Sequence, residues 1–195
     1  MIYFTSDVHL GHKNIISHCD RPFSSLEEMD QHLISYWNRR ISADDTVYIL
    51  GDLMFFCKDP QWYLERLNGR KHLIRGNHDS AWFHTMAKRR AKGVEGAREA
   101  SDFFQSVQDL LELKLDGTRL VLCHYPMMSW NHLEAGSYLL FGHIHNSVHA
   151  PYWPLLWGMD HALNVGVDIK DFRPVTFDEL LENNRRFRQL HPPQL

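Results

Sequence analysis

The stretch LNGRKHLIRGNHD, residues 67–79, sets a turn, a short β-rich run and a group of polar side chains in direct succession. Asn68-Gly69 is typical of a turn, and the run from His72 to Arg75 that follows it predicts a buried strand. Gly76 ends that strand, and a glycine there lets the backbone turn sharply and aim the next side chain inward. The stretch therefore predicts a strand that presents polar residues at its carboxyl end: Asn77, His78 and Asp79.

Two earlier stretches repeat this order of strand and polar residue. Ile2 to Thr5 predicts a buried strand that stops at Ser6-Asp7. Thr46 to Leu50 predicts a second strand, which stops at Gly51-Asp52. Each of the three strands thus ends in side chains that can carry chemistry.

Helical patterns lie between and after these strands. Ser25 and Glu28 predict a capping box before a helix with apolar residues at helical spacing, namely Leu26, Met29, Leu33 and Trp37. Thr176 and Glu179 predict the cap of a last helix, which runs to about Leu190. Strand–helix–strand alternation in the first half favours a mostly parallel sheet covered by helices.

The second half of the chain predicts a different sheet. A turn at Asp116-Gly117 joins two β-rich runs, Leu110 to Leu115 and Leu120 to Cys123, in a hairpin. Three further short strands are expected at Ser137 to Phe141, Ala162 to Val165 and Pro174 to Phe177. We therefore expect a second, more antiparallel sheet packed against the first, within one domain that spans residues 1–195.

Composition and charge argue against several classes of protein. Hydrophobic residues make up 44% and charged residues 23%, the balance of a globular domain. No apolar run approaches the ~20 residues that span a bilayer, and the N-terminus lacks a secretion signal, so a cytoplasmic location is expected. Three widely spaced cysteines, Cys19, Cys57 and Cys123, fit reduced thiols there. The net charge of −3 predicts neither long nucleic acid nor a membrane as partner.

Five polar motifs follow predicted strands, and ligands of α/β sheets bind beyond the carboxyl ends of the strands. The motifs contribute two carboxylates, one amide and four imidazoles, a set that cannot be buried together without compensating cations. Oxygen and imidazole ligands suit Mn²⁺, Fe, Co²⁺, Ni²⁺ or Zn²⁺. Seven ligands fit two metals that share a carboxylate and lie ~3.5–4 Å apart. The ligands would be Asp7, His9, Asp52, Asn77, His124, His143 and His145.

The ordered motifs D-x-H, G-D, G-N-H-D, H and G-H-x-H resemble those of the calcineurin-like metallophosphoesterase superfamily. Longer stretches resemble a small bacterial and phage subgroup of predicted phosphoesterases: DVHLGHKNII (7–16), YWNRRISADDTVYILGD (36–52), LNGRKHLIRGNHD (67–79), CHYPMMSWN (123–131) and NVGVD (164–168). The resemblance implies an α/β fold, a four-layer α/β-β/α sandwich of two mixed sheets flanked by helices, with a dimetal site at the strand ends.

The resemblance also implies a role for each motif residue. Asp7, His9 and His145 would hold one metal, and Asn77, His124 and His143 the other, with Asp52 as the bridge. A hydroxide that bridges the two metals would attack the phosphate ester, and His78 would assist the leaving group. Mn²⁺ is favoured as the metal, with Fe, Ni²⁺, Co²⁺ and Zn²⁺ left open.

Three functions remain in competition. We favour a phosphatase or phosphodiesterase that acts on a small phosphorylated substrate, with a nucleotide-like compound among the candidates. Protein phosphatase activity is disfavoured, because residues 51–56, GDLMFF, lack the acidic residue and arginine of that branch. A non-catalytic protein-binding scaffold is disfavoured because His78 is present, and a metal-dependent nuclease because no long basic surface is predicted. The sequence does not separate monoesters from diesters.

Four further features each carry more than one interpretation. His12 is predicted to contact substrate; the alternative is that it is a solvent-exposed residue at the start of a helix. Arg21 is predicted to clamp phosphate; the alternative is that it forms a salt bridge that braces its loop. Asp79 is expected to cap the helix that follows it, with the orientation of a neighbouring residue as the alternative. The aromatic loop from Trp153 to Trp157 is expected to pack onto the core, with stacking on a nucleobase or a dimer contact as the alternatives, and the oligomeric state is left open.

Overall fold

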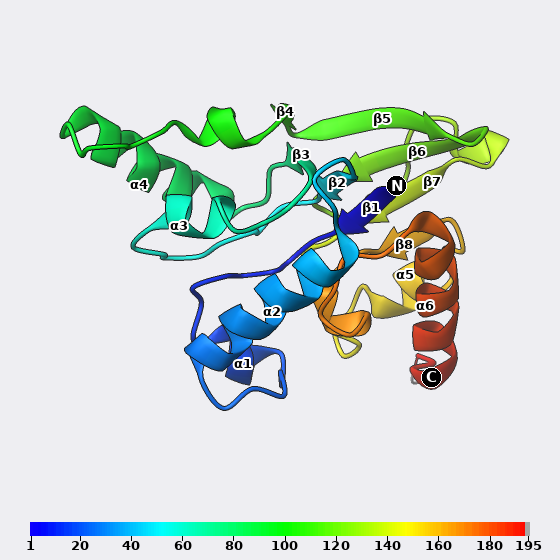
Figure 1. The fold of residues 1–195 in the computed structure, drawn as a ribbon. Helices are drawn as coiled ribbons and strands as arrows, with labels where there is room; N and C mark the ends of the chain where they lie inside the picture. The colour runs from blue at the N-terminus through cyan, green and yellow to red at the C-terminus, as the bar shows by residue number, and fades with distance from the viewer. Residues whose placement is uncertain (194–195) are drawn as a thin grey trace.

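Two four-stranded sheets form the centre of the structure, a computed structural model that describes residues 1–193 (Figure 1). The first sheet has the order β1-β2-β3-β4 and only parallel pairs. Its strands are β1 (Ile2–Thr5), β2 (Thr46–Ile49), β3 (Arg70–Ile74) and β4 (Ser106–Gln108). The second sheet has the order β5-β6-β7-β8. Its strands are β5 (Leu110–Leu115), β6 (Thr118–Cys123), β7 (Tyr138–Phe141) and β8 (Ala162–Asn164).

Helices follow most of the strands. Before the second sheet begins, the chain forms α1 (Ile15–His18), α2 (Leu26–Arg40), α3 (Pro60–Leu64), α4 (Asp79–Ala91) and the 3₁₀ turn η1 (Ala100–Phe103). Within and after the second sheet it forms η2 (Leu133–Ala135), α5 (Trp153–Trp157), η3 (Val167–Ile169) and α6 (Phe177–Leu190). The predicted capping box of α6 is present, because Thr176 and Glu179 each accept from the other's backbone N–H. That of α2 is only half formed: Ser25 caps the helix, but Glu28 accepts from Ser24 instead.

Alternation along the strands divides the core into three apolar layers. Successive strand residues point to opposite faces of a sheet, so Tyr3 packs against the residues of α2 and α4 while Phe4 packs between the sheets. In the second sheet, Leu140 faces the first sheet and Leu139 faces α5. The helices, two sheets and further helices thus form the four layers that the resemblance implies.

The second sheet departs from the expectation of a more antiparallel arrangement. Only the β5–β6 pair is antiparallel, and β6–β7 and β7–β8 pair in parallel. The segments 124–137 and 142–161 are long enough to return the chain to the same end of the sheet, which parallel pairing requires. Of the two sheets, only this second one is mixed.

Two local predictions are also corrected. The strand expected at Pro174 to Phe177 is a single bridge between Val175 and Phe4, because Thr176 already caps α6. The parallel strand β4 was not predicted, since it has only three residues and all of them are half-buried. The other predicted strands are confirmed, with ends shifted by no more than two residues.

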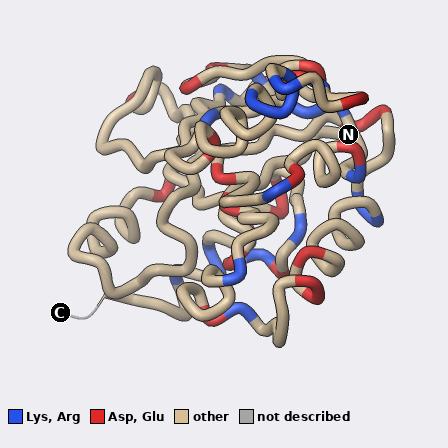
Figure 2. The backbone as a smooth tube through the Cα atoms, turned by 90° about the vertical axis from the view of Figure 1, so that its left-hand side faces the viewer, with Lys and Arg blue, Asp and Glu red and all other residues tan. Residues whose placement is uncertain are grey.

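Charges of both signs are distributed over the chain. Lys and Arg residues are interspersed with Asp and Glu residues along the backbone (Figure 2). Within residues 1–193, no helix is both long enough and apolar enough to cross a membrane.

Leu140 tests the packing between the sheets. It is fully buried in the middle apolar layer. We expect Leu140→Ala to lower the free energy of unfolding by about 2–5 kcal/mol, through lost apolar contact and the cavity left behind. Urea-induced unfolding measures the change. Leu155→Ala, at a position that is 56% exposed on α5, serves as the control and should change it by less than about 0.5 kcal/mol. Equal losses in the two variants would contradict this packing.

Candidate metal centre

The polar motifs follow β1, β2, β3, β6 and β7, and their side chains converge. Possible metal-ligating atoms of Asp7, His9 and His145 lie within 4.8 Å of one another. The same holds for Asp7, Asp52 and His124. Since Asn77 contacts both His124 and His143, all seven predicted ligands belong to one cluster.

One oxygen of Asp52 lies among three imidazoles. Its Oδ2 is 3.7 Å from Nε2 of His9 and 3.6 Å from Nε2 of His124. The third imidazole is that of His78, whose Nε2 lies 3.8 Å away. The other oxygen, Oδ1, accepts a hydrogen bond of 2.9 Å from the backbone N–H of His78. The carboxylate is therefore fixed by one oxygen, and the other faces both predicted ligand groups.

The amide oxygen of Asn77 joins the second predicted ligand group. Its Oδ1 lies 3.0 Å from Nε2 of His124 and 3.0 Å from Nδ1 of His143. The opposite nitrogen of His124, Nδ1, lies 2.8 Å from the carbonyl oxygen of Leu50. A hydrogen bond to that carbonyl leaves Nε2 of His124 as the nitrogen that faces the cluster.

Asp7 is completely buried at the end of β1. Its carboxylate accepts from Ser6 Oγ at 2.7 Å and from the backbone N–H of His143 at 3.1 and 3.0 Å. Burial raises the pKa of this carboxyl group, although the neighbouring histidines oppose the shift. A cation beside Asp7 would stabilise the ionised form that burial disfavours.

Five of the seven predicted ligands have a backbone in the left-handed region. The φ angles are 56° at Asp7, 54° at His9, 53° at Asp52, 72° at His143 and 51° at His145. Such angles are uncommon outside glycine and cost of order 1–3 kcal/mol each, so they persist only where the surrounding structure imposes them. Here, Asp7 and His9 donate their backbone N–H groups to Gly51 and Asp52. The fold thus holds these side chains inward against local preference.

The protonation of His9 suits a metal ligand. Burial lowers the pKa of His9 well below its usual value, and the charges of His145 and Arg21 lower it further. Its Nε2 is buried and has no hydrogen-bond partner among residues 1–193. A neutral imidazole with an unpartnered buried nitrogen, next to two carboxylates, is the donor set that a divalent cation binds. The residues present therefore fit a pair of such cations.

The sequence comparisons agree with this geometry. Residues 1–154 match the family model described as the calcineurin-like phosphoesterase superfamily domain. The chain belongs to the calcineurin-like phosphoesterase superfamily. Its family uses divalent metals, and the Asp/His groups above are of the kind that would hold them.

Three relatives show how far this likeness extends. The uncharacterized protein MJ1445 of Methanocaldococcus jannaschii is 31% identical over 97% of this chain and 96% of its own length. The gene 66 protein of Mycobacterium phage D29 is 31% identical over 75% of this chain and 79% of its own. The crystal structure of AQ665 from Aquifex aeolicus, at 23% identity, has a TM-score of 0.66 over 93% of this chain and 98% of that one. This last likeness shows the fold.

Arg21 has a different role from the phosphate contact predicted for it. Its side chain is fully buried, with Nε 2.8 Å from Asp168 Oδ1. Its two terminal nitrogens donate to the backbone carbonyls of Val8 and Asp7, at 2.9 and 2.7 Å. The prediction of a substrate contact is wrong for this structure, because every nitrogen of the guanidinium already has a protein partner. The alternative prediction, a salt bridge that braces the loop, is confirmed by the pair of Arg21 and Asp168.

Asp168 contacts a predicted ligand, although no role was predicted for it from the sequence. Its Oδ2 lies 2.8 Å from Nδ1 of His145. Burial lowers the pKa of His145, but hydrogen bonds to Asp168 and Cys19 outweigh burial and raise it to about 10. With that pKa both ring nitrogens carry protons near neutral pH, so a bound cation would have to displace the proton on Nε2 while Nδ1–H stays on Asp168. The only signal was that Asp168 ends the NVGVD stretch, to which no role was assigned.

Asp79 does not cap α4 as predicted, and the alternative, that it orients its neighbours, is what the structure has. His78 is the N-cap residue, and Asp79 is the first residue of the helix. The buried Asp79 carboxylate accepts from the backbone N–H groups of Asp52, Leu53 and Gly76, at 3.0, 3.1 and 2.7 Å. It therefore ties the loop after β2 to the loop after β3, and so sets the position of Asp52 relative to Asn77.

His78 and His12 lie at the accessible side of the cluster. The side chain of His78 is 35% exposed, so a substrate can reach it. His12 is half-buried, with Nδ1 3.3 Å from Nδ1 of His9. Burial, together with the charge of the nearby His78, lowers the pKa of His12 to about 4. The substrate contact predicted for His12 stays a prediction, and the structure places the residue where one can form.

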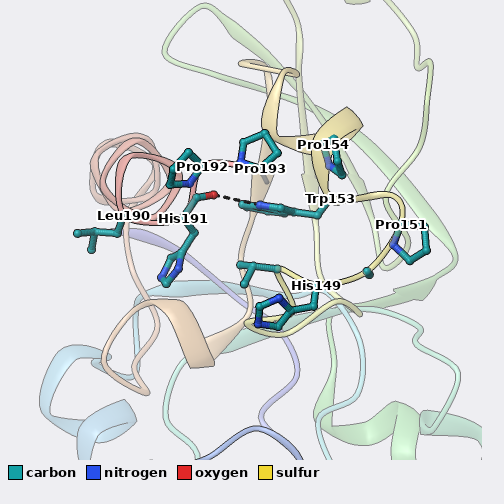
Figure 3. Close-up of a pocket in the computed structure, with 10 residues that line it drawn as sticks. His149, Pro151, Trp153, Pro154, Leu190, His191, Pro192 and Pro193 are labelled. Carbon is teal, nitrogen blue, oxygen red and sulfur yellow. Dashed lines mark hydrogen bonds between the residues drawn. The ribbon is translucent and has the colours of Figure 1, made fainter. Parts of the chain in front are cut away.

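The aromatic segment before Asp160 is a short helix, α5, and not the loop that was expected. Trp153 is buried, and its indole N–H donates to the carbonyl of His191 at 3.1 Å, beside a hollow of about 580 Å³ (Figure 3). Trp157 donates to the carbonyl of Arg188 at 3.0 Å. Trp153 belongs to the apolar cluster beside the second sheet, which confirms the prediction that it packs onto the core. Trp157 is 36% exposed, so for this ring the same prediction is wrong, and only its hydrogen bond holds it to the end of α6.

Gly142 provides a first test of the centre. A Cβ at this position would lie 1.9 Å from Ser6 Oγ and 2.6 Å from Asp7 Oδ2. We expect Gly142→Ala to displace Asp7 and to weaken Mn²⁺ binding by at least about tenfold, as measured by calorimetry. Gly158→Ala is the control, because its nearest contact would be an ordinary 3.6 Å. Unchanged Mn²⁺ affinity in Gly142→Ala would remove Asp7 from the ligand set.

Asp168 provides a second test. Asparagine keeps one oxygen acceptor for His145 but loses the charge that pairs with Arg21. We expect Asp168→Asn to lower Mn²⁺ affinity roughly 10–100-fold, the usual effect of removing a partner that orients a ligand. Asp109→Asn removes an exposed carboxylate that also pairs with an arginine, Arg75, and should leave the affinity unchanged. If both variants bound Mn²⁺ like the wild type, Asp168 would not orient His145.

Proposed function

We propose that the protein is a divalent-metal-dependent phosphoesterase that hydrolyses a small phosphate mono- or diester. The observation that most supports this is the position of Asp52. One of its oxygens lies 3.6–3.8 Å from three imidazoles: His9 of one ligand group, His124 of the other, and the accessible His78. A carboxylate in that position can bridge two cations while a proton donor stands beside it.

The ligand groups divide around Asp52. Asp7, His9 and His145 would hold one cation, and Asn77, His124 and His143 the other. The donors are oxygen and imidazole without thiolate, a set that accepts Mn²⁺, Fe, Co²⁺, Ni²⁺ and Zn²⁺ and does not choose among them; of these we propose Mn²⁺. A bound pair of such cations supplies charge that acidifies water and offsets the negative charge of a phosphoryl group.

His78 would assist the leaving group. Its imidazole reaches solvent, and its backbone N–H is bonded to Asp52, so that the two residues keep a fixed relation. An imidazole so placed can donate a proton to the departing oxygen, or hold a phosphate oxygen by a hydrogen bond. The buried carboxylates Asp79 and Asp168 would take no part in proton transfer and would hold the ligands in position.

A small phosphorylated compound is the partner that the surface supports best. Long nucleic acid binds through many phosphate contacts from clustered Lys and Arg side chains. In this chain the basic residues are interspersed with acidic ones (Figure 2), and the net charge is −3. A nuclease of long chains is therefore the weaker candidate. A protein-binding scaffold remains the rival from another class, and an activity assay separates it from the enzyme.

The assay uses bis(p-nitrophenyl) phosphate and p-nitrophenyl phosphate with the Mn²⁺-loaded protein. We expect turnover that a chelator abolishes and added Mn²⁺ restores. His78→Ala should lower kcat by about 10²–10⁴-fold with the bound metal retained, because it removes a proton donor and no ligand. Asp52→Asn should lower both activity and bound metal, since it weakens the bridge.

His84→Ala supplies the matched control, as His84 is an exposed histidine on the same helix that His78 caps. It should keep full activity. Wild-type protein that binds two equivalents of Mn²⁺ yet hydrolyses neither ester would favour the scaffold, and full activity in His78→Ala would remove that residue from the mechanism.

A further inference from the structure

The loop after β2 presents a phenylalanine to solvent. Phe56 is 78% exposed, and its φ angle of 47° lies in the left-handed region. Both properties are unfavourable, since an apolar ring remains in water and a residue with a Cβ has a backbone that favours glycine. Strain of this kind concentrates at binding and catalytic sites.

Phe55 connects this ring to the metal centre. Its ring centroid lies 4.4 Å from that of Phe56 and 4.4 Å from that of His78. On the same side it lies 4.2 Å from the ring of His12. A continuous row of rings therefore leads from the predicted proton donor to the exposed Phe56.

Phe56 also lines a hollow of about 480 Å³. Its lining includes three aromatic residues, Phe56, Trp62 and Tyr63, together with Gly11, the residue before His12. Trp62 is itself 42% exposed. The volume falls within the usual range for small-molecule sites, which are mostly apolar with a few polar groups.

The polar groups of the hollow are few and mostly engaged. Asp59 accepts the backbone N–H of Trp62, and the hydroxyl of Tyr63 donates to Asp30 at 2.5 Å. Lys58 lines the hollow and forms no ion pair with any residue in 1–193. The hollow thus offers aromatic faces and one available cation, which suits a planar heterocycle with acceptor atoms at its edge and not a sugar, which needs many hydrogen bonds.

We propose that this hollow binds the base of a nucleotide whose phosphate lies at the metal centre. The inference rests on the proposed phosphoesterase function and names its substrate class. Ring contacts of 4.4 Å each lead from His78 through Phe55 to Phe56, so the two outer rings are close enough for one nucleotide to place its phosphate near His78 and its base near Phe56. Phe56 would stack on the base, because aromatic side chains bind bases of any sequence through their π faces.

The experiment compares two ligands that differ only by the base. Calorimetry on the Mn²⁺-loaded protein gives the affinities for adenosine 5′-monophosphate and for ribose 5-phosphate. We expect the wild type to bind the nucleotide about tenfold more tightly, the effect of one stacked base. Phe56→Ala should remove that preference and leave the affinity for ribose 5-phosphate unchanged.

Two further variants separate stacking from other effects. Phe56→Leu keeps an apolar side chain without a π face, so it should lose most of the preference. Tyr152→Ala removes another exposed aromatic residue, 42% exposed and next to α5, and should keep the preference. Since Phe56 is exposed, its variants should unfold at the wild-type urea concentration, which verifies that they are folded.

Equal affinity of the wild type for both ligands, or an equal loss of both affinities in Phe56→Ala, would overturn the base site. Hydrolysis of a simple diester without any preference for the nucleotide would leave the phosphoesterase standing and this inference refuted. Preference for the nucleotide without hydrolysis of any ester would leave the base-binding hollow standing and would refute the phosphoesterase.

Discussion

Parallel pairing of β1 with β2 and of β2 with β3 brings the carboxyl ends of three strands to one edge, and the metal centre depends on that register. Thr5 pairs with Ile49, and Ile49 pairs with Leu73. Asp7, Asp52 and Asn77 then follow within two to four residues of these positions. Since β6 and β7 end at the same place in the second sheet, His124 and the His143/His145 pair complete the ring of ligands.

The position of a strand end does not by itself fix the direction of the side chain that follows it. A buried network of hydrogen bonds fixes the loops after the strands. Arg21 bonds the backbone carbonyls of Asp7 and Val8, and Asp79 bonds backbone N–H groups of both the β2 and the β3 loops. These contacts hold left-handed backbone angles that isolated peptides would not keep. The ligands are consequently pre-positioned by hydrogen bonds that do not themselves involve a cation.

Much of this arrangement was predictable from sequence, because it depends on short local patterns. A β-rich run, a glycine and a polar residue recur at β2, β3 and β7, and each repetition marked a predicted ligand that the structure brings into the cluster. Short β-rich runs predicted the strands of both sheets except β4. In the second sheet, the crossovers were read as connections of an antiparallel sheet, since local pattern does not reveal the direction in which a strand returns.

The residues that were missed or misassigned act over long sequence separations. Arg21 and Asp168 are 147 positions apart, so neither suggests the other in the sequence. Asp79 has the position of a helix cap, and only the folded chain shows that its partners come from the β2 loop. No role was predicted for Phe56 from the sequence, since local pattern does not reveal that its ring is 78% exposed beside a hollow lined by residues from Gly11 to Tyr63.

The pairing of Arg21 with Asp168 also bears on where this domain ends. The family match stops at residue 154, by which point all seven predicted ligands have been passed. A fragment cut there would nevertheless lack β8, α6 and the carboxylate that faces His145. The side chains that the structure brings to the candidate centre therefore extend beyond the segment that the family model matches, and a homologue shortened at this point should be examined for a substitute acid before it is assumed to bind metal.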